Sequence, residues 1–269
     1  MSDCTLNTVE TDGLSMDYAC FGEGEKNLVI IPGLAIKSPV RSASALEAPY
    51  KIFREKYRLF FFDRKKNAEQ GYSLLSMAKD QAAVMKKMGL ENASVMGVSQ
   101  GGMIAQLLAI HYPDLVGKLV LASSTSKAEP LQLETIGKWA CLARVHDASG
   151  LVNAFIDDCF SEGFANRYRK VIQKMYKDVS VEEMERFAIF ADACDYVDTY
   201  ADLGKIKCPT LVLGAGADRV VTPEASEKIA EKLKSEKVPC EFYMYEGCGH
   251  AVFDELHEYK ERIFRFLEK

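Results

Sequence analysis

Apolar and polar positions alternate in two different rhythms along the first half of the chain. Strand patterns cover residues 5–10, 15–21, 28–31, 58–62, 94–96 and 118–122. Helical spacing marks residues 43–56, 73–88 and 100–112. Asp12-Gly13 is the predicted turn of a hairpin between the first two strands. Strands that alternate with helices predict an α/β fold with a mainly parallel sheet.

The alternation stops between residues 126 and 203, where the pattern predicts aromatic-rich helices and no strand. Beyond this segment, strands are predicted at 210–214 and 241–245, and amphipathic helices at 223–235 and 254–267. The simplest interpretation is a single domain over residues 1–269, with residues 126–203 as a helical insertion.

Gly97-Val98-Ser99-Gln100-Gly101 fits the G-x-S-x-G pattern of a nucleophile elbow. It lies between a predicted strand and a predicted helix, which is the context that the chemistry requires. A sharp strand-to-helix turn presents its central side chain above the sheet, and small flanking residues let neighbouring backbone approach. Ser99 is therefore the candidate nucleophile.

A serine hydroxyl is a poor nucleophile at neutral pH, so it needs a base, and the base needs an orienting carboxylate. Asp218 follows the predicted strand 210–214, and His250 follows the strand 241–245. Both lie at the carboxyl ends of strands, where open α/β sheets bind ligands. We predict that Asp218 is the acid and His250 the base.

Alternatives to these assignments remain open from the residues alone. Asp218 has an ordinary turn aspartate as its other interpretation, and His250 a buried structural histidine. The loop after the strand 118–122 holds no carboxylate, which favours Asp218 as the acid. The three remaining histidines fit less well as the base, because they lie at a helix end, in the insertion and inside the final helix. They are His111, His146 and His257.

Developing negative charge on a substrate oxygen needs two backbone N–H donors. Gln100 supplies one, since its N–H lies at a predicted helix N-terminus. The second is expected from the loop after the strand 28–31, where Leu34 follows Pro32-Gly33. Backbone donors do not depend on side-chain identity, so leucine is acceptable there.

Taken together, the motifs resemble the α/β-hydrolase superfamily, in the branch of serine esterases with a helical lid after the sixth strand. The motifs are Pro32-Gly33, Asp63-Arg64, Gly97 to Gly102, Gly214 to Pro223 and Gly249-His250-Ala251. The resemblance covers essentially the whole chain. It implies an eight-stranded sheet whose second strand is antiparallel, helices on both faces, and residues 126–203 as the lid. The family's nucleophile, acid and base map onto Ser99, Asp218 and His250.

Two loops depart from the family's pattern. Pro32-Gly33 stands where His-Gly is usual, and Lys65 to Tyr72 replaces a loop with spaced glycines and a serine. We expect both loops to border the pocket, so substrate identity does not transfer from relatives.

Composition narrows the possible partners and the compartment. The net charge is −5 with no basic stripe, so no nucleic-acid partner is expected. No apolar run approaches the roughly 20 residues of a membrane span, and Met1 to Cys4 lack the features of a secretory signal. The eight cysteines contain no C-x-x-C pair, which indicates buried free thiols in a reducing compartment and predicts a cytoplasmic protein.

The sequence thus predicts a serine hydrolase that cleaves a small ester, thioester or lactone with an apolar acyl part. No metal and no organic cofactor are expected; the aspartates at helical spacing within the insertion are interpreted as a solvated face. These are Asp192, Asp195, Asp198 and Asp202. The alternatives are an acyltransferase, a lyase or a cofactor-free haloperoxidase-like enzyme of the same fold, or a ligand-binding relative without turnover.

Overall fold

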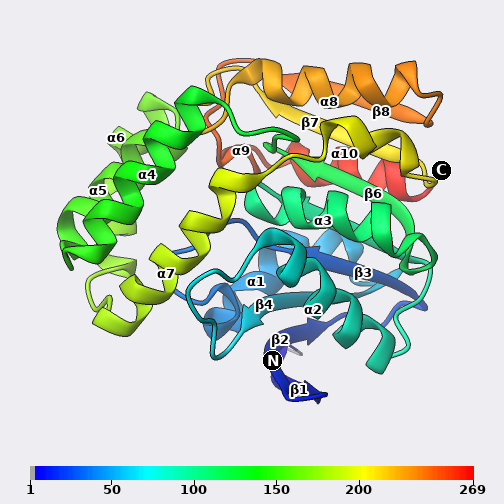
Figure 1. The fold of residues 1–269 in the computed structure, drawn as a ribbon, viewed down its shortest axis with the longest axis horizontal. Coiled ribbons are helices and arrows are strands. Elements are labelled where there is room, and N and C mark those ends of the chain that lie inside the picture. The colour runs from blue at the N-terminus through cyan, green and yellow to red at the C-terminus, as the bar shows by residue number, and fades with distance from the viewer. Residues whose placement is uncertain (1–3) are drawn as a thin grey trace.

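Eight strands form one sheet in the computed structural model, which describes residues 4–269 (Figure 1). Residues 1–3, on which the expectation of no secretory signal rests in part, lie outside the described residues, as do the side chains of residues 42–44. The strands are β1 (Thr5–Thr11), β2 (Leu14–Phe21), β3 (Lys26–Ile31), β4 (Tyr57–Lys65), β5 (Ala93–Val98), β6 (Val116–Ala122), β7 (Thr210–Ala215) and β8 (Cys240–Tyr245).

The order of strands across the sheet is β1-β2-β4-β3-β5-β6-β7-β8. Strand β2 pairs antiparallel with both of its neighbours, and the pairs from β4 to β8 are parallel. The β1–β2 hairpin turns at Asp12 and Gly13, both of which have positive φ. The predicted eight-stranded, mainly parallel sheet with an antiparallel second strand is therefore confirmed.

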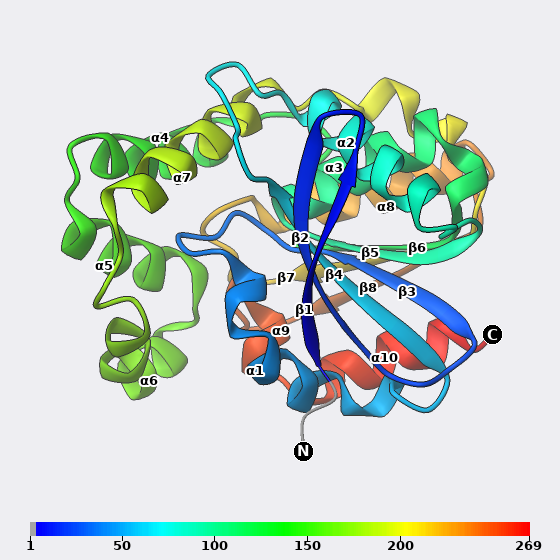
Figure 2. The same cartoon turned by 90° about the horizontal axis from the view of Figure 1, so that it is seen from below.

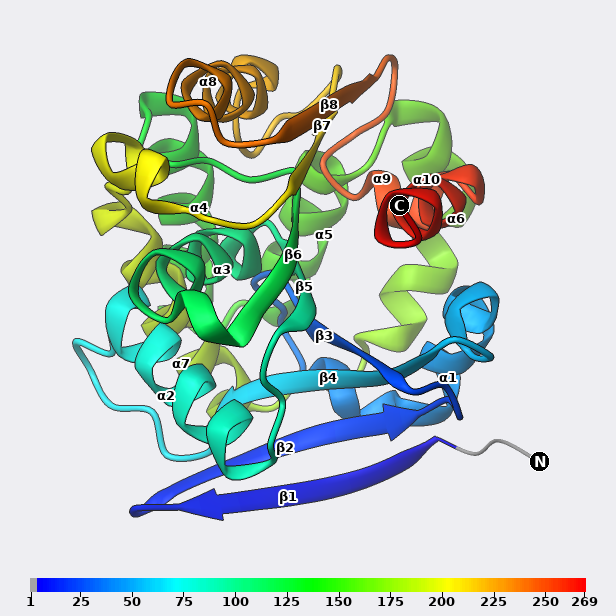
Figure 3. The same ribbon diagram turned by 90° about the vertical axis from the view of Figure 1, so that its right-hand side faces the viewer.

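Helices cover both faces of the sheet (Figures 2 and 3). One face carries α2 (Leu74–Lys87), α3 (Gln100–His111) and α8 (Pro223–Ser235), and the other carries α1 (Ala43–Glu47), α9 (Val252–Glu255) and α10 (Glu258–Leu267). The apolar residues 28–31 of strand β3 show why both faces must be covered. Its Val29 and Ile31 belong to one buried cluster, whereas Leu28 and Ile30 belong to the cluster on the opposite face.

The prediction of one helix over residues 43–56 is wrong in length. The α-helix ends at Glu47, and Ala48–Phe53 forms a 3₁₀ segment interrupted at Tyr50 (φ −106°, ψ 15°). Pro49 explains the break, because its nitrogen has no hydrogen to donate and its ring disfavours helical backbone at the preceding residue.

The helix predicted over residues 254–267 is in fact two helices. Leu256 is extended (φ −123°, ψ 124°) and separates α9 from α10. His257 is consequently the N-cap residue of α10. The prediction that it lies inside the final helix is wrong.

The segment between β6 and β7 is helical, as predicted. It contains α4 (Pro130–Arg144), α5 (Ala148–Cys159), α6 (Glu162–Met175) and α7 (Val181–Ala193). We call residues 126–203 the insertion; its helices project from one end of the sheet (Figure 1). Its aromatic residues pack largely on one another, as in the Trp139–Phe155 and Phe160–Phe164 pairs, whose ring centroids are 4.9 and 5.0 Å apart.

All eight cysteines are free thiols. Cys159, Cys194, Cys208 and Cys248 are buried as expected, but Cys141 on α4 is exposed. Over the part of the chain that the structure describes, no helix is both long enough and apolar enough to cross a membrane.

Candidate active site

Ser99 occupies a sharp turn between β5 and α3. Its backbone has φ 52° and ψ −119°, a conformation that non-glycine residues rarely adopt. The neighbouring strand holds this turn from both sides of the residue: the Ser99 N–H donates to the Ala122 carbonyl (2.8 Å), and the Ser124 hydroxyl donates to the Ser99 carbonyl (2.8 Å). The strained turn is thus supported by β6 and the loop after it.

The glycines of the motif are required because backbone approaches them closely. A Cβ atom on Gly97 would lie 2.3 Å from the Gly101 carbonyl oxygen. A Cβ atom on Gly101 would lie 2.0 Å from the Ile31 carbonyl oxygen at the end of β3. The pattern therefore lets α3 begin directly against the sheet, with Ser99 at the carboxyl ends of the strands.

His250 lies between Ser99 and Asp218. Its Nδ1 is 2.7 Å from Asp218 Oδ2, and its Nε2 is 2.8 Å from Ser99 Oγ. The other carboxylate oxygen, Oδ1, accepts the backbone N–H groups of Val220 (2.8 Å) and Val221 (3.0 Å). With Asp218 held in this way, Oδ2 accepts Nδ1–H, and Nε2 is left to accept the serine proton.

The structure thus places the three predicted residues within hydrogen-bond reach of one another. Ser99, Asp218 and His250 come from the loops after β5, β7 and β8, and each is less than 10% exposed. The other histidines lie elsewhere. His111 ends α3 at the far end from Ser99, His146 joins α4 to α5, and His257 begins α10.

The two predicted oxyanion donors flank Ser99. Gln100 begins α3, and the loop of Gly33 and Leu34 passes so close that a Cβ on Gly33 would be 3.8 Å from Ser99 Oγ. Neither the Leu34 nor the Gln100 N–H donates to a protein acceptor anywhere in residues 4–269. Two unused donors beside a serine hydroxyl are what an oxyanion needs.

A buried arginine connects these two segments. Arg64, near the end of β4, donates from Nη2 to the Pro32 carbonyl (2.7 Å) and to Gln100 Oε1 (3.3 Å). Its Nε is buried and has no hydrogen-bond partner. Burial lowers the pKa of Arg64 from 12.5 to about 10, against the opposing effect of the adjacent Asp63 carboxylate, so the group is a cation at neutral pH.

Helix α7 of the insertion contacts the same region. Arg186 Nη2 donates to Asp63 Oδ1 (2.9 Å) and to the Arg64 carbonyl (3.3 Å). The sequence shows Asp63-Arg64 as a motif but indicates no role for the pair. It predicts Gln100 only as a backbone donor and gives no signal for Arg186. No local pattern marks these side chains, because their partners are distant in the sequence.

The insertion also contacts the His250 loop, at the corner between α5 and α6. The Ala251 N–H donates to the Cys159 carbonyl (2.8 Å). The Glu255 carboxylate of α9 accepts the Ser161 N–H (2.7 Å), the Ser161 hydroxyl (2.6 Å) and the Gly249 N–H (3.2 Å). This corner of the insertion is therefore tied to the loop that carries the candidate base.

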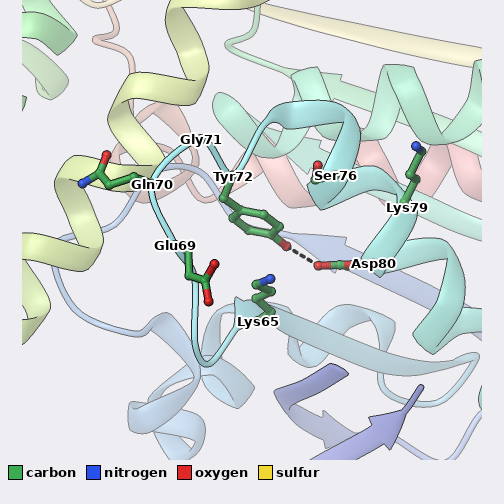
Figure 4. A pocket seen from close by; sticks show the side chains of 8 residues that line it. All are labelled: Lys65, Glu69, Gln70, Gly71, Tyr72, Ser76, Lys79 and Asp80. Carbon is green, nitrogen blue, oxygen red and sulfur yellow. Dashed lines mark hydrogen bonds between the residues drawn. The ribbon is translucent and has the colours of Figure 1, made fainter. Parts of the chain in front are cut away.

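Two pockets lie near the loops that depart from the family's pattern. A narrow one of about 10 Å³ is lined by Gly33, Asp63, Arg64 and Gln100, together with Arg186 and Phe190 of α7. Residues 65–72 line a different, open pocket of about 370 Å³ against α2, where the Tyr72 hydroxyl donates to Asp80 (2.7 Å; Figure 4). Of the two loops expected to border the pocket, the one with Pro32-Gly33 contributes Gly33 to the narrow pocket that Gln100 lines, whereas the loop from Lys65 to Tyr72 lines only the open one.

Residues 72–257, more than half of the chain, match the family model described as "Serine aminopeptidase, S33" (Hydrolase_4). The chain belongs to this family. It is a member of the α/β-hydrolase superfamily, a conclusion that agrees with the sheet order, the elbow and the helices on both faces. Membership in this family indicates a hydrolase and leaves the substrate open.

Known hydrolases resemble this family member over nearly its whole length. The 3-oxoadipate enol-lactonase 2 of Acinetobacter baylyi is 22% identical over 235 residues, which cover 84% of this chain and 85% of the relative. The solved structure of MGS-M2, an α/β hydrolase from a Medee basin deep-sea metagenome library, has a TM-score of 0.87 at 19% identity, over 98% of both chains. The enol-lactonase of Burkholderia xenovorans has a TM-score of 0.84 at 18% identity, over 98% of this chain and 100% of that one. At these identities the structural matches establish the fold alone.

Proposed function

We propose that this protein is a serine hydrolase that cleaves a small carboxylic ester, thioester or lactone through an acyl-enzyme on Ser99. The observation that carries the proposal is His250, which contacts Ser99 Oγ at 2.8 Å and Asp218 Oδ2 at 2.7 Å. The Leu34 and Gln100 N–H groups, one in the loop that passes Ser99 and one at the start of α3, donate to no protein acceptor in residues 4–269. This arrangement supports acyl transfer to a serine.

In the first half-reaction, Ser99 Oγ attacks the substrate carbonyl carbon while its proton passes to His250 Nε2. The carbonyl oxygen becomes an oxyanion and accepts the Leu34 and Gln100 N–H groups. Collapse of this intermediate breaks the bond to the leaving oxygen or sulfur, which takes the proton from the imidazolium. Asp218 stabilises that imidazolium and remains ionised.

In the second half-reaction, water takes the place of the leaving group. His250 removes a proton from the water as the new carbon–oxygen bond forms at the acyl carbon. The second intermediate then releases Ser99 Oγ, which regains a proton from His250. The product is a carboxylic acid; for a lactone substrate it is the ring-opened hydroxy acid.

The insertion acts in this proposal as a lid over the site. The pocket between Gly33 and Gln100 is narrow, and α7 supplies two of its lining residues, Arg186 and Phe190. A substrate group can occupy that pocket only if it widens, and α7 is the wall that the insertion contributes. The names of two similar proteins, both enol-lactonases, support including a lactone among the first substrates to be tried.

A series of p-nitrophenyl esters from acetate to decanoate, together with a small lactone, tests this function. We expect turnover with at least one class, and a maximum of kcat/KM at the chain length that fills the acyl pocket. Ser99→Ala should lower kcat by about 10⁴ to 10⁶, whereas Ser235→Ala, an exposed serine on α8, should change nothing. Equal turnover by wild type and Ser99→Ala would exclude the proposed mechanism.

A further inference from the structure

The side chain of Gln100, the residue after the candidate nucleophile, is buried and contacts the insertion. Its Nε2 donates to the Phe190 carbonyl of α7 (2.6 Å) and lies 3.2 Å from Cys194 Sγ. Its Oε1 accepts from Arg64 Nη2 (3.3 Å). The residue that offers a backbone donor to the oxyanion is thereby fixed through both ends of its amide.

Arg64 holds the other half of the proposed oxyanion hole with the same nitrogen. Nη2 is 2.7 Å from the Pro32 carbonyl, one peptide before the Gly33–Leu34 peptide that carries the second donor. Gly33 has no side chain to pack, so this charge-assisted bond is what restrains the peptide plane next to it. One guanidinium therefore joins the two segments on which the donors lie.

Helix α7 restrains Arg64 from the opposite side. Asp63 Oδ1 accepts the Arg64 backbone N–H (2.7 Å) and Arg186 Nη2 (2.9 Å). The Arg186 guanidinium also lies over the Phe190 ring, 4.5 Å from its centroid. The path from the insertion to the oxyanion hole is thus continuous: α7, then Asp63 and Arg64, then the two donor segments.

The burial of Arg64 is unfavourable for the stability of the fold. Arg64 is almost completely buried, its Nε donor is unsatisfied, and a buried cation carries a desolvation penalty that one partly shared carboxylate does not remove. Buried, imperfectly satisfied charges concentrate where a protein uses them in its chemistry.

We propose that Arg64 is a positioning residue for the oxyanion hole, and that α7 restrains Arg64 through Arg186 and restrains Gln100 through the Phe190 carbonyl. Arg64 makes no bond to Ser99 and acts through the two donor segments. It fixes the Pro32–Leu34 loop and Gln100 so that both N–H groups point at the same oxyanion. The inference rests on the proposed function. It identifies α7 as the helix of the insertion whose position affects the geometry of the oxyanion hole.

Kinetics of Arg64→Met and Arg64→Lys on the best p-nitrophenyl ester test this role. Loss of one oxyanion donor in a serine hydrolase lowers kcat by about 10²–10³, so we expect Arg64→Met to lower kcat about 10- to 100-fold. KM should stay within threefold, because the neutral ground-state carbonyl depends little on these donors. Arg64→Lys should recover part of the loss, since it keeps the charge and one bond. The pH dependence of kcat/KM should keep its shape, because Arg64 does not contact His250.

Arg169→Met is the matched control, since Arg169 is also an arginine that pairs with an aspartate, Asp157, but on the outer helix α6. It should leave kcat and KM unchanged. If Arg64→Met does not fold, Gln100→Met keeps the side-chain volume, removes both amide contacts and should lower kcat about 5- to 20-fold with KM unchanged.

Folded Arg64→Met and Gln100→Met proteins with wild-type kcat would overturn the inference, and so would effects confined to KM. The proposed function fails separately: it falls if Ser99→Ala keeps its activity in the same assay. A Ser99-dependent activity that is indifferent to Arg64 and Gln100 would reject the positioning role alone.

Discussion

The two sides of Ser99 are built in different ways. On the acid–base side, Asp218 is oriented by backbone N–H groups only two and three residues further along, and His250 comes from the loop after the adjacent strand. On the oxyanion side, side chains from β4, α3 and α7 meet at Arg64. Each acid–base residue is thus placed by its own loop after a strand, whereas the oxyanion side depends on side-chain contacts between separate elements.

The insertion contacts both sides. On the acid–base side its Cys159 and Phe160 carbonyls accept from the Ala251 N–H and from Arg219, and its Ser161 donates to Glu255. On the oxyanion side its Phe190 carbonyl accepts from Gln100, and the Arg186 side chain alone makes the bonds to Asp63 and to the Arg64 carbonyl. We infer that substitutions within the insertion affect the oxyanion side more readily than the acid–base side.

Removal of the base should have the largest effect. His250→Ala is expected to lower kcat by about 10⁶, and Asp218→Asn by about 10⁴ because it favours the wrong imidazole tautomer. Steady-state kinetics on the best ester measure both, with His257→Ala as the control outside the site. Losses in His250→Ala or Asp218→Asn of less than tenfold would mean that the acid–base side is misassigned.

The next effect tests the close approach of backbone on the oxyanion side. A Cβ on Gly101 would lie 2.0 Å from the Ile31 carbonyl oxygen and 2.5 Å from that of Pro32. Both contacts are with backbone, so the oxyanion loop must shift. Gly101→Ala should therefore lose roughly 2–4 kcal/mol of unfolding free energy and more than 100-fold in kcat. Denaturant unfolding and ester kinetics measure the two losses.

Gly163→Ala provides the matched comparison. Gly163 lies in the first turn of α6, and a Cβ there would meet no heavy atom within 4 Å. Alanine should be neutral or stabilise the protein by up to about 1 kcal/mol, because it favours helical backbone. Equal behaviour of the two alanine variants would contradict the described packing of the elbow.

A smaller effect distinguishes the two contacts of the insertion. Arg186→Met should lower kcat about 3- to 10-fold through Arg64, with little change in stability beyond about 1 kcal/mol. Glu255→Gln should show the reverse: a loss of about 1–2 kcal/mol of stability, since it weakens bonds to Ser161 and Gly249, and a smaller loss of kcat. Glu261→Gln, an exposed position on α10, is the control. If Glu255→Gln is the more damaging to kcat, the contrast between the two sides is wrong.

The smallest effect lies far from either side, at the C-terminal end of the chain. Bonds from Lys56, Lys26 and the Tyr57 hydroxyl lower the pKa of Glu268 to about 2. Because the pKa of Glu268 is lower in the folded protein, its carboxylate stabilises the fold at pH values above the unfolded pKa of about 4.5. This stabilisation is lost as the pH falls toward 2. Glu268→Gln should therefore lower Tm by about 1 °C at pH 7 and not at all near pH 2, with kcat unchanged. A Tm difference that persists at pH 2 would show another cause.

Much of this architecture could be predicted from the sequence because it depends on local patterns. The apolar strands, the G-x-S-x-G turn and the positions of Asp218 and His250 after strands are each visible within about ten residues. The break at Leu256 cannot be predicted, since nothing in its local sequence marks it, whereas the break after Glu47 is signalled by Pro49. The linkage of Pro32, Arg64 and Gln100 could not be predicted either, because it exists only once β3, β4 and α3 pack together.

The central claim is that Ser99 forms a covalent acyl intermediate, and a fluorophosphonate probe measures this most directly. Intact-mass spectrometry after labelling, followed by peptide mapping, should show one adduct per chain, on the peptide that contains Ser99. The adduct should be absent in Ser99→Ala and slow to form in His250→Ala. A probe adduct on any other residue, or one that persists in Ser99→Ala, would contradict the account.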